Sequence, residues 1–322
     1  MPRRERLDFK GASHYVVIRG AVGAEIFFDA LHFKAFPRAP RQSAPHALKF
    51  EHYLIETRDE CGALLHAYCL ESNRAILVLT STGAPLHAFM QRLCGRYARY
   101  FRAGGFSAGR TVFAARYNAK VIAPDYLPHA VRRVHRSPID SGLCKQRVDY
   151  PFSSDRAYSG EPSSVRFDMA DVKAALELKG YSGPRGYRNF MDQAETPHVA
   201  NLLSRGSLLD SRIVGDKVFV QKARHSAAHP PASPTREELI AGVARLLNCT
   251  ADAIFSPTHI GALARALVAW YGVRSGTATV AEIGRWFSVT GATLGQAIRH
   301  QRQIRPDLFA LVLPHSRSVS ID

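Results

Sequence analysis

Acidic residues are scarce in this sequence of 322 residues, and one long stretch has none. Lys and Arg number 43 against 27 Asp and Glu, which gives a formal charge of +16 and an isoelectric point near 10.0. No Asp or Glu occurs from Ser72 to Pro124. Such an excess of positive charge calls for a polyanionic partner. Nucleic acid is the commonest one, and an anionic membrane surface is the alternative.

Long apolar runs and paired cysteines are also lacking. No apolar run approaches the ~20 residues that span a bilayer. The basic start MPRRERLDFK is not followed by the apolar core of a signal peptide. The five cysteines are scattered and form no C-x-x-C pair, which excludes a disulfide framework and a zinc finger. We therefore expect a cytoplasmic, nucleoid-associated protein without a membrane partner.

Length and composition predict two globular domains. An apolar content of 46% with 22% charged residues excludes a mostly disordered chain. Residues 223–235, ARHSAAHPPASPT, combine three prolines with small residues and show no periodicity, which is typical of a linker. We therefore predict a first domain at 1–222, a helical second domain at 236–304 and a tail at 305–322.

The first domain shows the order strand, helix, strand, strand, helix, strand. Two apolar runs joined by Ser72-Asn73 predict a hairpin. This order predicts an α+β, ferredoxin-like fold, one antiparallel sheet with helices on one face. The predicted strands are 14–20, 64–71, 74–80 and about 119–122, and the predicted helices are 28–57 (broken by prolines), 86–102 and 125 to about 136.

The helix at 86–102 carries three arginines on one face. Arg92, Arg96 and Arg99 recur at i, i+4 and i+7, beside the apolar stripe. Like charges at this spacing repel one another, and a counter-anion would relieve the repulsion. We interpret this face, with Arg116 farther along the acid-free stretch, as a site of phosphate contact. The alternative is an ordinary solvated basic face.

Two helices joined by a short turn stand near the end of the second domain. Residues 280–287 and 292–303 have the pattern of a helix-turn-helix, and Thr290 is the expected N-cap of the second helix. Gln and Arg can contact base edges in a duplex, and Thr can reach bases or phosphates. The alternative is a plain helical hairpin. The side chains that we expect to face outward are Thr293, Gln296, Arg299, His300 and Gln303.

Several stretches of the first domain resemble a known family. They are HYVVIRGAVGAEIFFD (14–29), HAYCLESNRAILVL (66–79), PLHAFMQRLCGRYARYF (85–101), ARYNAKVIAPDYL (115–127), SPIDSGL (137–143) and DYPFSSDRAYSGE (149–161). In this order they are similar to the single-tyrosine HUH transposases of the insertion-sequence-200-like group, in its REP-associated branch, over about residues 1–222. The second domain resembles, more loosely, the DNA-binding helix-turn-helix of the replication initiator DnaA.

The chain departs from this family where the chemistry would occur. The family carries Asn-His-hydrophobic-His on a strand, and its two histidines hold a divalent metal. Here Arg74 and Ile76 stand at those positions, and neither offers a lone pair to a cation. The family's nucleophilic tyrosine corresponds to Arg133, which cannot form the covalent link to phosphate. Asn73 and Pro138 keep the match in register.

Nearby residues are weak substitutes for the lost groups. Tyr126 lies seven residues before Arg133, about 10 Å along a helix axis, and Tyr117 stands close to the matched site. His129, one turn before Arg133, is a possible ligand, and His66 also lies near the matched site. We expect each of them to have an ordinary structural or surface role.

The resemblance implies a DNA-binding protein that has lost cleavage and needs no cofactor. With Arg132 and Arg136 added, Arg74 and Arg133 predict a basic cleft that holds phosphate without cutting it. Single-stranded or hairpin DNA is the expected partner of the first domain and duplex DNA that of the second, and the family implies a homodimer. Two alternatives stay open. One is an active transposase that uses replacement residues with Mg²⁺ or Mn²⁺. The other is a helix-turn-helix regulator whose first domain is an inert scaffold.

Overall fold

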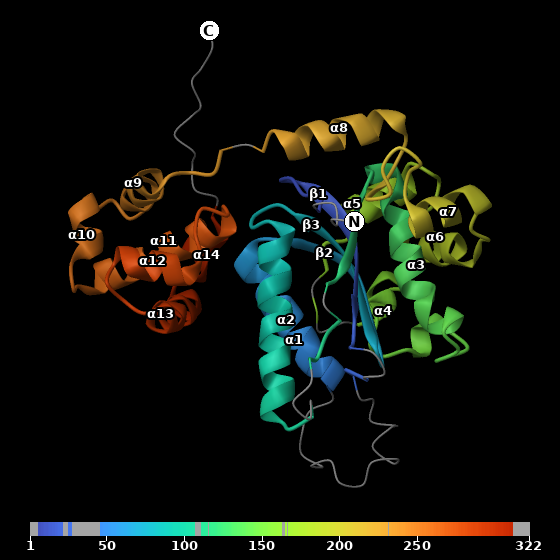
Figure 1. Cartoon of the computed structure of the whole chain (residues 1–322), viewed down its shortest axis with the longest axis horizontal. Helices are drawn as coiled ribbons and strands as arrows, with labels where there is room; N and C mark the ends of the chain where they lie inside the picture. The colour runs from blue at the N-terminus through green and yellow to red at the C-terminus, as the bar shows by residue number, and fades with distance from the viewer. Residues whose placement is uncertain are drawn as a thin grey trace. The chain divides into compact units, whose positions relative to one another are not determined.

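The computed structural model describes residues 6–21, 25–27, 46–106, 111–114, 116–162, 165, 167–230 and 232–311. The chain divides into two compact units, one of residues 1–59 and 63–230 and one of residues 60–62 and 231–322. No helix among the described residues is long and apolar enough to cross a membrane. The first unit is α+β, and the second is helical (Figure 1).

The first unit is built on a five-stranded sheet in the order β2-β3-β1-β4-β5. β1 pairs with β3 and β4, and β2 pairs with β3, all antiparallel, whereas β4 and β5 are parallel. The sheet is therefore mixed, and the expectation of a purely antiparallel sheet was wrong because residues far along the chain add β5. The strands are β1 (Ala12–Arg19), β2 (Leu64–Glu71), β3 (Arg74–Ser81), β4 (Asn118–Ile122) and β5 (Ile213–Val214).

Helices cover both faces of this sheet rather than one. α1 (His46–Cys61) and α2 (Leu86–Ala103) lie on one side, and α3 (Leu127–Asp140) packs against β2 and β3 on the other (Figure 1). The predicted hairpin and the helix at 86–102 are confirmed. β2 and β3 are buried almost throughout, as their continuous apolar sequences require once both faces are covered. The expectation of helices on one face was wrong because α3 covers the second.

Short helices follow α3 and cover it. A 3₁₀ turn, η2 (Pro124–Tyr126), precedes α3. α8 ends at Ala228, and its residue Ala223 is fully buried, so the predicted linker begins too early in the chain. The elements after α3 are η3 (Arg147–Asp149), α4 (Asp155–Tyr158), α5 (Ala170–Glu177), α6 (Gly183–Asp192), α7 (Pro197–Arg205) and α8 (Lys217–Ala228).

The second unit packs its helices around one apolar core. Residues from all of its helices enter this core, among them Leu239, Ile254, Leu267, Ile283, Leu294 and Phe309. The last helix belongs to the core as well, because Trp270 Nε1 donates to Phe309 O at 2.9 Å. A tail was predicted from residue 305, whereas residues 306–310 form a helix that packs in this core. The helices are α9 (Arg236–Leu246), α10 (Ala251–Phe255), α11 (His259–Arg274), α12 (Val280–Trp286), α13 (Gly291–Ile304) and α14 (Pro306–Ala310).

Threonine starts five consecutive helices of the second unit. The side chain of each accepts a hydrogen bond from a backbone N–H of the first turn, which satisfies a donor that would have no partner within the helix. The prediction of Thr290 as an N-cap is confirmed. The capping threonines are Thr235, Thr250, Thr258, Thr279 and Thr290.

Candidate nucleic-acid interface

Arg74, at the first residue of β3, is held by groups of its own unit. Its guanidinium donates to Glu71 at 2.5 Å (Nε to Oε2) and 3.1 Å (Nη2 to Oε1). The same Nη2 lies 3.2 Å from Ser137 Oγ and 2.9 Å from Ser141 Oγ, at the end of α3. Glu71 is 4% exposed, so this ion pair is partly shielded from water. Arg74 thus joins the hairpin to α3.

Ile76 shares the sheet face of Arg74, because side chains alternate along a strand. Its neighbours in register are Val17 on β1 and Cys69 on β2, and it is 3% exposed. Within the described residues no group of three or more His, Cys, Asp or Glu could hold a metal ion. At Arg74 and Ile76 this face therefore presents a paired guanidinium and a buried aliphatic side chain.

The three arginines of α3 hold the helices that cover it. Arg132 is 3% exposed, and its Nη1 lies 3.3 Å from Phe190 O at the end of α6, with the guanidinium 4.8 Å from the Phe190 ring. Arg133 donates to Ala200 O at 3.3 Å and to Ser204 Oγ at 2.9 Å, both on α7. Arg136 donates to the carbonyl of Met191 at 3.3 Å. The guanidinium groups from which a basic cleft was predicted are thus engaged by groups of the same unit.

Tyr15 and Lys120 lie beside Arg133, and this pair was not predicted from the sequence. They are direct partners in the β1–β4 register, so they share one sheet face. Burial raises the pKa of Tyr15, and the charges of Arg133 and Arg74 oppose that change. Burial, and then the charge of Arg133, lowers the pKa of Lys120 to about 8. Lys120 Nζ donates to the carbonyls of Leu203, at 2.9 Å, and Ser204. The alternation of β-strand side chains could have suggested this placement once the register was known.

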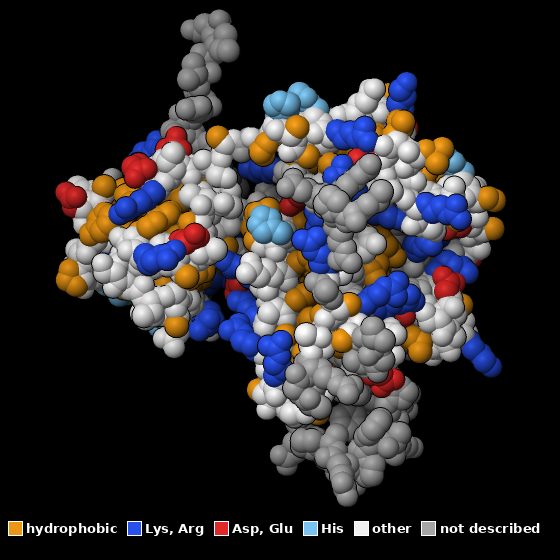
Figure 2. Space-filling view, viewed as in Figure 1, with side chains coloured by type: hydrophobic (Ala, Val, Ile, Leu, Met, Phe, Trp, Pro, Cys, Tyr) orange, Lys and Arg blue, Asp and Glu red, His pale blue; other side chains and the backbone are white. Residues whose placement is uncertain are grey.

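The arginines on α2 are placed differently. Arg99 is exposed, and Arg92 and Arg96 are half-buried. Arg96 Nη1 lies 3.8 Å from Glu56 Oε2 on α1, so part of its charge is compensated. Arg116 is also exposed. Lys and Arg side chains outnumber acidic ones over the visible face of the first unit (Figure 2).

The tyrosines and histidines predicted from the sequence as weak substitutes for the lost groups are dispersed. The Tyr117 ring lies under the Arg6 guanidinium, 3.7 Å from its centroid. His66 is fully buried and bonds to Thr80 Oγ1 and to Asp168 O, each at 2.7 Å. Only Tyr126 and His129 lie near each other, with ring centroids 6.3 Å apart. Among the described residues, these groups therefore form no shared site.

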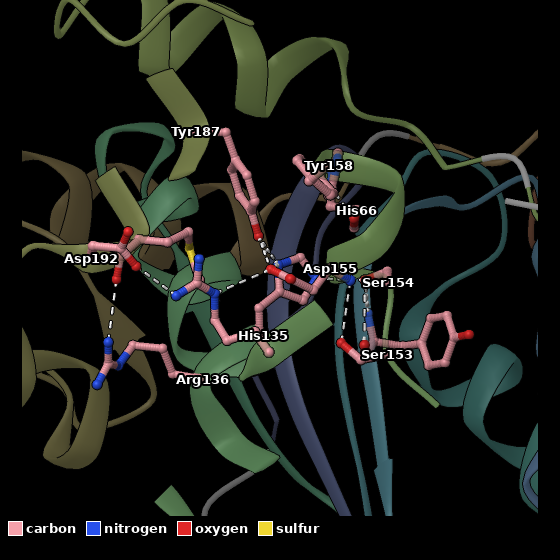
Figure 3. Close-up of polar contacts among 12 residues, drawn as sticks. His66, His135, Arg136, Ser153, Ser154, Asp155, Tyr158, Tyr187 and Asp192 are labelled. Atoms are coloured by element: carbon pink, nitrogen blue, oxygen red, sulfur yellow. Dashed lines mark hydrogen bonds and ion pairs between the residues drawn. The ribbon is translucent and has the colours of Figure 1, made fainter. Parts of the chain in front are cut away.

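A buried polar cluster ties α3 to the segment after it. His135 Nδ1 lies 2.7 Å from Tyr187 Oη, and its Nε2 lies 2.6 Å from Ser154 Oγ (Figure 3). Tyr187 in turn donates to Asp155 at 2.5 Å. Burial lowers the pKa of His135 to about 4, which keeps the ring neutral at pH 7. Because His135 and Asp155 are both fully buried, this cluster stabilises the fold and is closed to a substrate. Its serine and aspartate come from the stretch DYPFSSDRAYSGE.

In the second unit, α13 presents polar side chains to solvent. Its apolar residues Leu294 and Ile298 are 2% and 7% exposed, against the core. The turn before α13 is tight: a Cβ on Gly284 would lie 2.6 Å from the carbonyl oxygen of Val289. Ser288 holds a left-handed φ of 56° in this turn. All five residues expected to face outward are exposed: Thr293, Gln296, Arg299, His300 and Gln303.

Comparisons with known proteins give a distant similarity to solved structures. No family model and no curated protein matches this chain. Among solved structures, a REP-associated tyrosine transposase bound to a REP hairpin is similar, at 17% sequence identity and a TM-score of 0.37. That match covers 52% of this chain and 93% of the other. These comparisons place the chain in no family.

Proposed function

We propose that this protein binds DNA, and that α12 and α13 form a helix-turn-helix that reads a duplex. The observation that carries this proposal is the exposed polar face of α13, with Gln296 and Arg299 on it. No acidic residue occurs from 283 to 306, so nothing on this helix repels phosphate. An α-helix fits the major groove, where each base pair shows a distinct pattern of donors and acceptors.

The residues of α13 suit different parts of a duplex. Gln296 and Arg299 can make bidentate contacts to adenine and guanine edges. Thr293 lies in the first turn, where hydroxyl groups and backbone N–H groups meet phosphates. His300 and Gln303 extend the polar face toward the end of the helix. This arrangement separates contacts that read sequence from contacts that set position.

The first unit is proposed to be a ferredoxin-like relative of the HUH transposases that has lost metal-dependent cleavage. The motif resemblance over residues 1–222 supports this relationship, and the βαββαβ order of its elements is compatible with it. The loss follows from the chemistry at Arg74, Ile76 and Arg133. Since Arg74, Arg132 and Arg133 are engaged within the unit, the exposed Arg99 and Arg116 are the stronger candidates for phosphate contact. A nucleoid-associated homodimer remains part of the proposal.

The test is selection of a preferred duplex from a random library, followed by binding measurements with variants. Arg299→Ala is expected to weaken the selected duplex by about 1–3 kcal/mol and to relax base preference. Arg245→Ala removes an equal charge from an exposed position on α9 and is the matched control. Equal affinities of the two variants for the selected duplex would contradict the role of α13.

A truncation separates the two units. Because α8 ends at Ala228 and the units divide at Pro230, the chain is cut after Pro230. The first unit alone is expected to keep affinity for single-stranded hairpins and to lose the selected duplex. Complete loss of hairpin binding would support the alternative of an inert scaffold. In either case affinity should fall steeply with salt, because phosphate contacts release counterions.

A further inference from the structure

A surface groove of about 470 Å³ opens in the first unit, and none of the residues assigned above to DNA contact lines it. Four segments distant in sequence build it: the connection from β4 into α3, the residue Lys179 after α5, α7, and the first turns of α8. A volume of this size suits a small organic molecule. The residues that line it are Ala123, Pro124, Asp125, Tyr126, His129, Lys179, Val199, Asp216, Val218, Phe219 and Lys222.

Lys179 is fixed at one side of the groove by neutral acceptors. Its Nζ donates to Asp125 O at 3.1 Å and lies 3.3 Å from His129 Nε2. Burial, and then the charge of Lys179, lowers the pKa of His129 to about 4, so this ring is neutral at pH 7. An ammonium group can only donate, so Nε2 accepts and the ring proton sits on Nδ1. The charge of Lys179 therefore remains available to an anion.

A second cation and two aromatic rings complete the lining. Lys222 is exposed on α8, one turn after Val218. Tyr126 and Phe219 line the groove from different segments. Aromatic side chains offer a face for a base, and lysines offer a point charge for a phosphate. The combination matches a ligand that has one aromatic end and one anionic end.

Two carboxylates limit the anionic charge that the groove can accept. Asp216 caps α8, accepting from Phe219 N at 2.7 Å, and Asp125 stands at the start of η2. Two lysines and two aspartates together carry no net charge, which disfavours a polyphosphate or a long stretch of backbone. One phosphate beside the lysines, with a base on the rings, satisfies both sets of groups. The free carboxylate oxygens can accept from the amino group of a base.

We propose that this groove binds a single nucleotide unit, with its base against Tyr126 and Phe219 and its phosphate at Lys179 and Lys222. The unit can come from a free nucleotide or from an unpaired nucleotide of a DNA strand. This site is separate from α13, so it extends the proposed function without depending on it.

The experiment titrates the full chain with deoxyadenosine monophosphate, with a single-stranded deca-deoxyadenylate and with inorganic phosphate, by calorimetry. Binding of the monophosphate identifies a free nucleotide, and binding of the decanucleotide alone identifies a strand. In both cases Lys222→Ala is expected to weaken the interaction roughly tenfold or more, the loss of one charge-assisted hydrogen bond. Lys217→Ala removes an equal charge from the same helix outside the groove and should change the affinity less than twofold.

Three results would overturn the nucleotide site. These are the absence of binding by both nucleotide probes, equal affinities of the two lysine variants, and inorganic phosphate binding as tightly as the monophosphate. Tyr126→Leu tests the aromatic contact and should weaken both nucleotide probes but not inorganic phosphate. The selected duplex is measured in parallel with each variant. Its affinity should stay unchanged, so failure of this site is distinguishable from failure of duplex recognition by α13.

Discussion

Arg74 and Glu71 face each other across the turn between β2 and β3, with Arg74 Nε 2.5 Å from Glu71 Oε2. The Glu71 side chain is 5% exposed and that of Arg74 is 26% exposed. Both partners of such an ion pair lose hydration. Removal of one charged side chain then leaves the other as an uncompensated buried charge. Arg74 is therefore a structural residue that pairs with Glu71 and joins the hairpin to α3.

Arg74→Ala should lower the free energy of unfolding of the first unit by about 2 kcal/mol, because Glu71 then stays buried without its partner. Urea denaturation measures the change. Arg99→Ala, at an exposed position on α2, should stay within about 0.5 kcal/mol of the wild type. Adding Glu71→Gln to Arg74→Ala should recover part of the loss. If the effects of the two substitutions on the free energy of unfolding simply add, Arg74 and Glu71 do not stabilise each other.

The elements of the first unit that were predictable have local signals. The β2–β3 hairpin follows from two apolar runs and a two-residue turn, and α2 follows from an apolar stripe at helical spacing. Even the pairing of Arg74 with Glu71 was accessible, since the hairpin register places them opposite each other. Arg74 was predicted instead to line a basic cleft, because the register of the hairpin was not considered.

The short helices that pack over α3 have no comparable signal in the sequence. Arg132 and Arg133 contact residues 58 to 71 positions away, on the short helices α6 and α7 and on the segment beside them. Short helices have weak periodicity, and their existence depends on tertiary contacts more than on local propensity. The arginines could be located on one helix from the sequence, but the carbonyl groups that they bind could not. The same holds for the groove around Tyr126, whose four segments meet only in the fold.

The buried histidine His135 predicts a loss of stability in acid. Burial, together with the charge of Arg147, lowers its folded pKa to about 4, while Asp155 opposes this shift. As the pH falls, His135 takes up a proton near pH 6.5 in the unfolded chain but not in the folded one. The contribution of neutral His135 to the free energy of unfolding is therefore complete above pH 6.5, and it is lost as the pH falls to about 4. This shift corresponds to about 3 kcal/mol.

Urea denaturation at several pH values between 7 and 4 checks this prediction. His135→Gln should reduce the dependence of unfolding free energy on pH, while a slope from other buried histidines such as His46 remains, because burial also lowers its pKa to about 4. The exposed His87 provides the control variant His87→Gln. If all three proteins lose stability with the same slope, protonation of His135 is not responsible.

Two substitutions at the turn before α13 should change the stability of the second unit in opposite directions. Ser288 holds φ at 56°, a conformation that glycine adopts without a steric penalty, so Ser288→Gly should stabilise the second unit by about 0.5–1 kcal/mol. Gly284→Ala should destabilise it by about 2 kcal/mol, because the new Cβ would meet the carbonyl of Val289 at 2.6 Å. Scanning calorimetry resolves both changes. A stabilising Gly284→Ala would show that this turn can open without cost.

Divalent metal provides the sharpest prediction about the first unit. Millimolar Mn²⁺ or Mg²⁺ should leave hairpin affinity and the thermal midpoint unchanged, and no nicked product or covalent adduct should appear. The reason is that Arg74 and Ile76 offer no lone pair to a cation, and Arg133 cannot attack phosphorus. Cleavage assays are combined with mass spectrometry of the protein. An adduct on Tyr126 or Tyr117 that vanishes in Tyr126→Phe or Tyr117→Phe would instead demonstrate an active transposase with a relocated nucleophile.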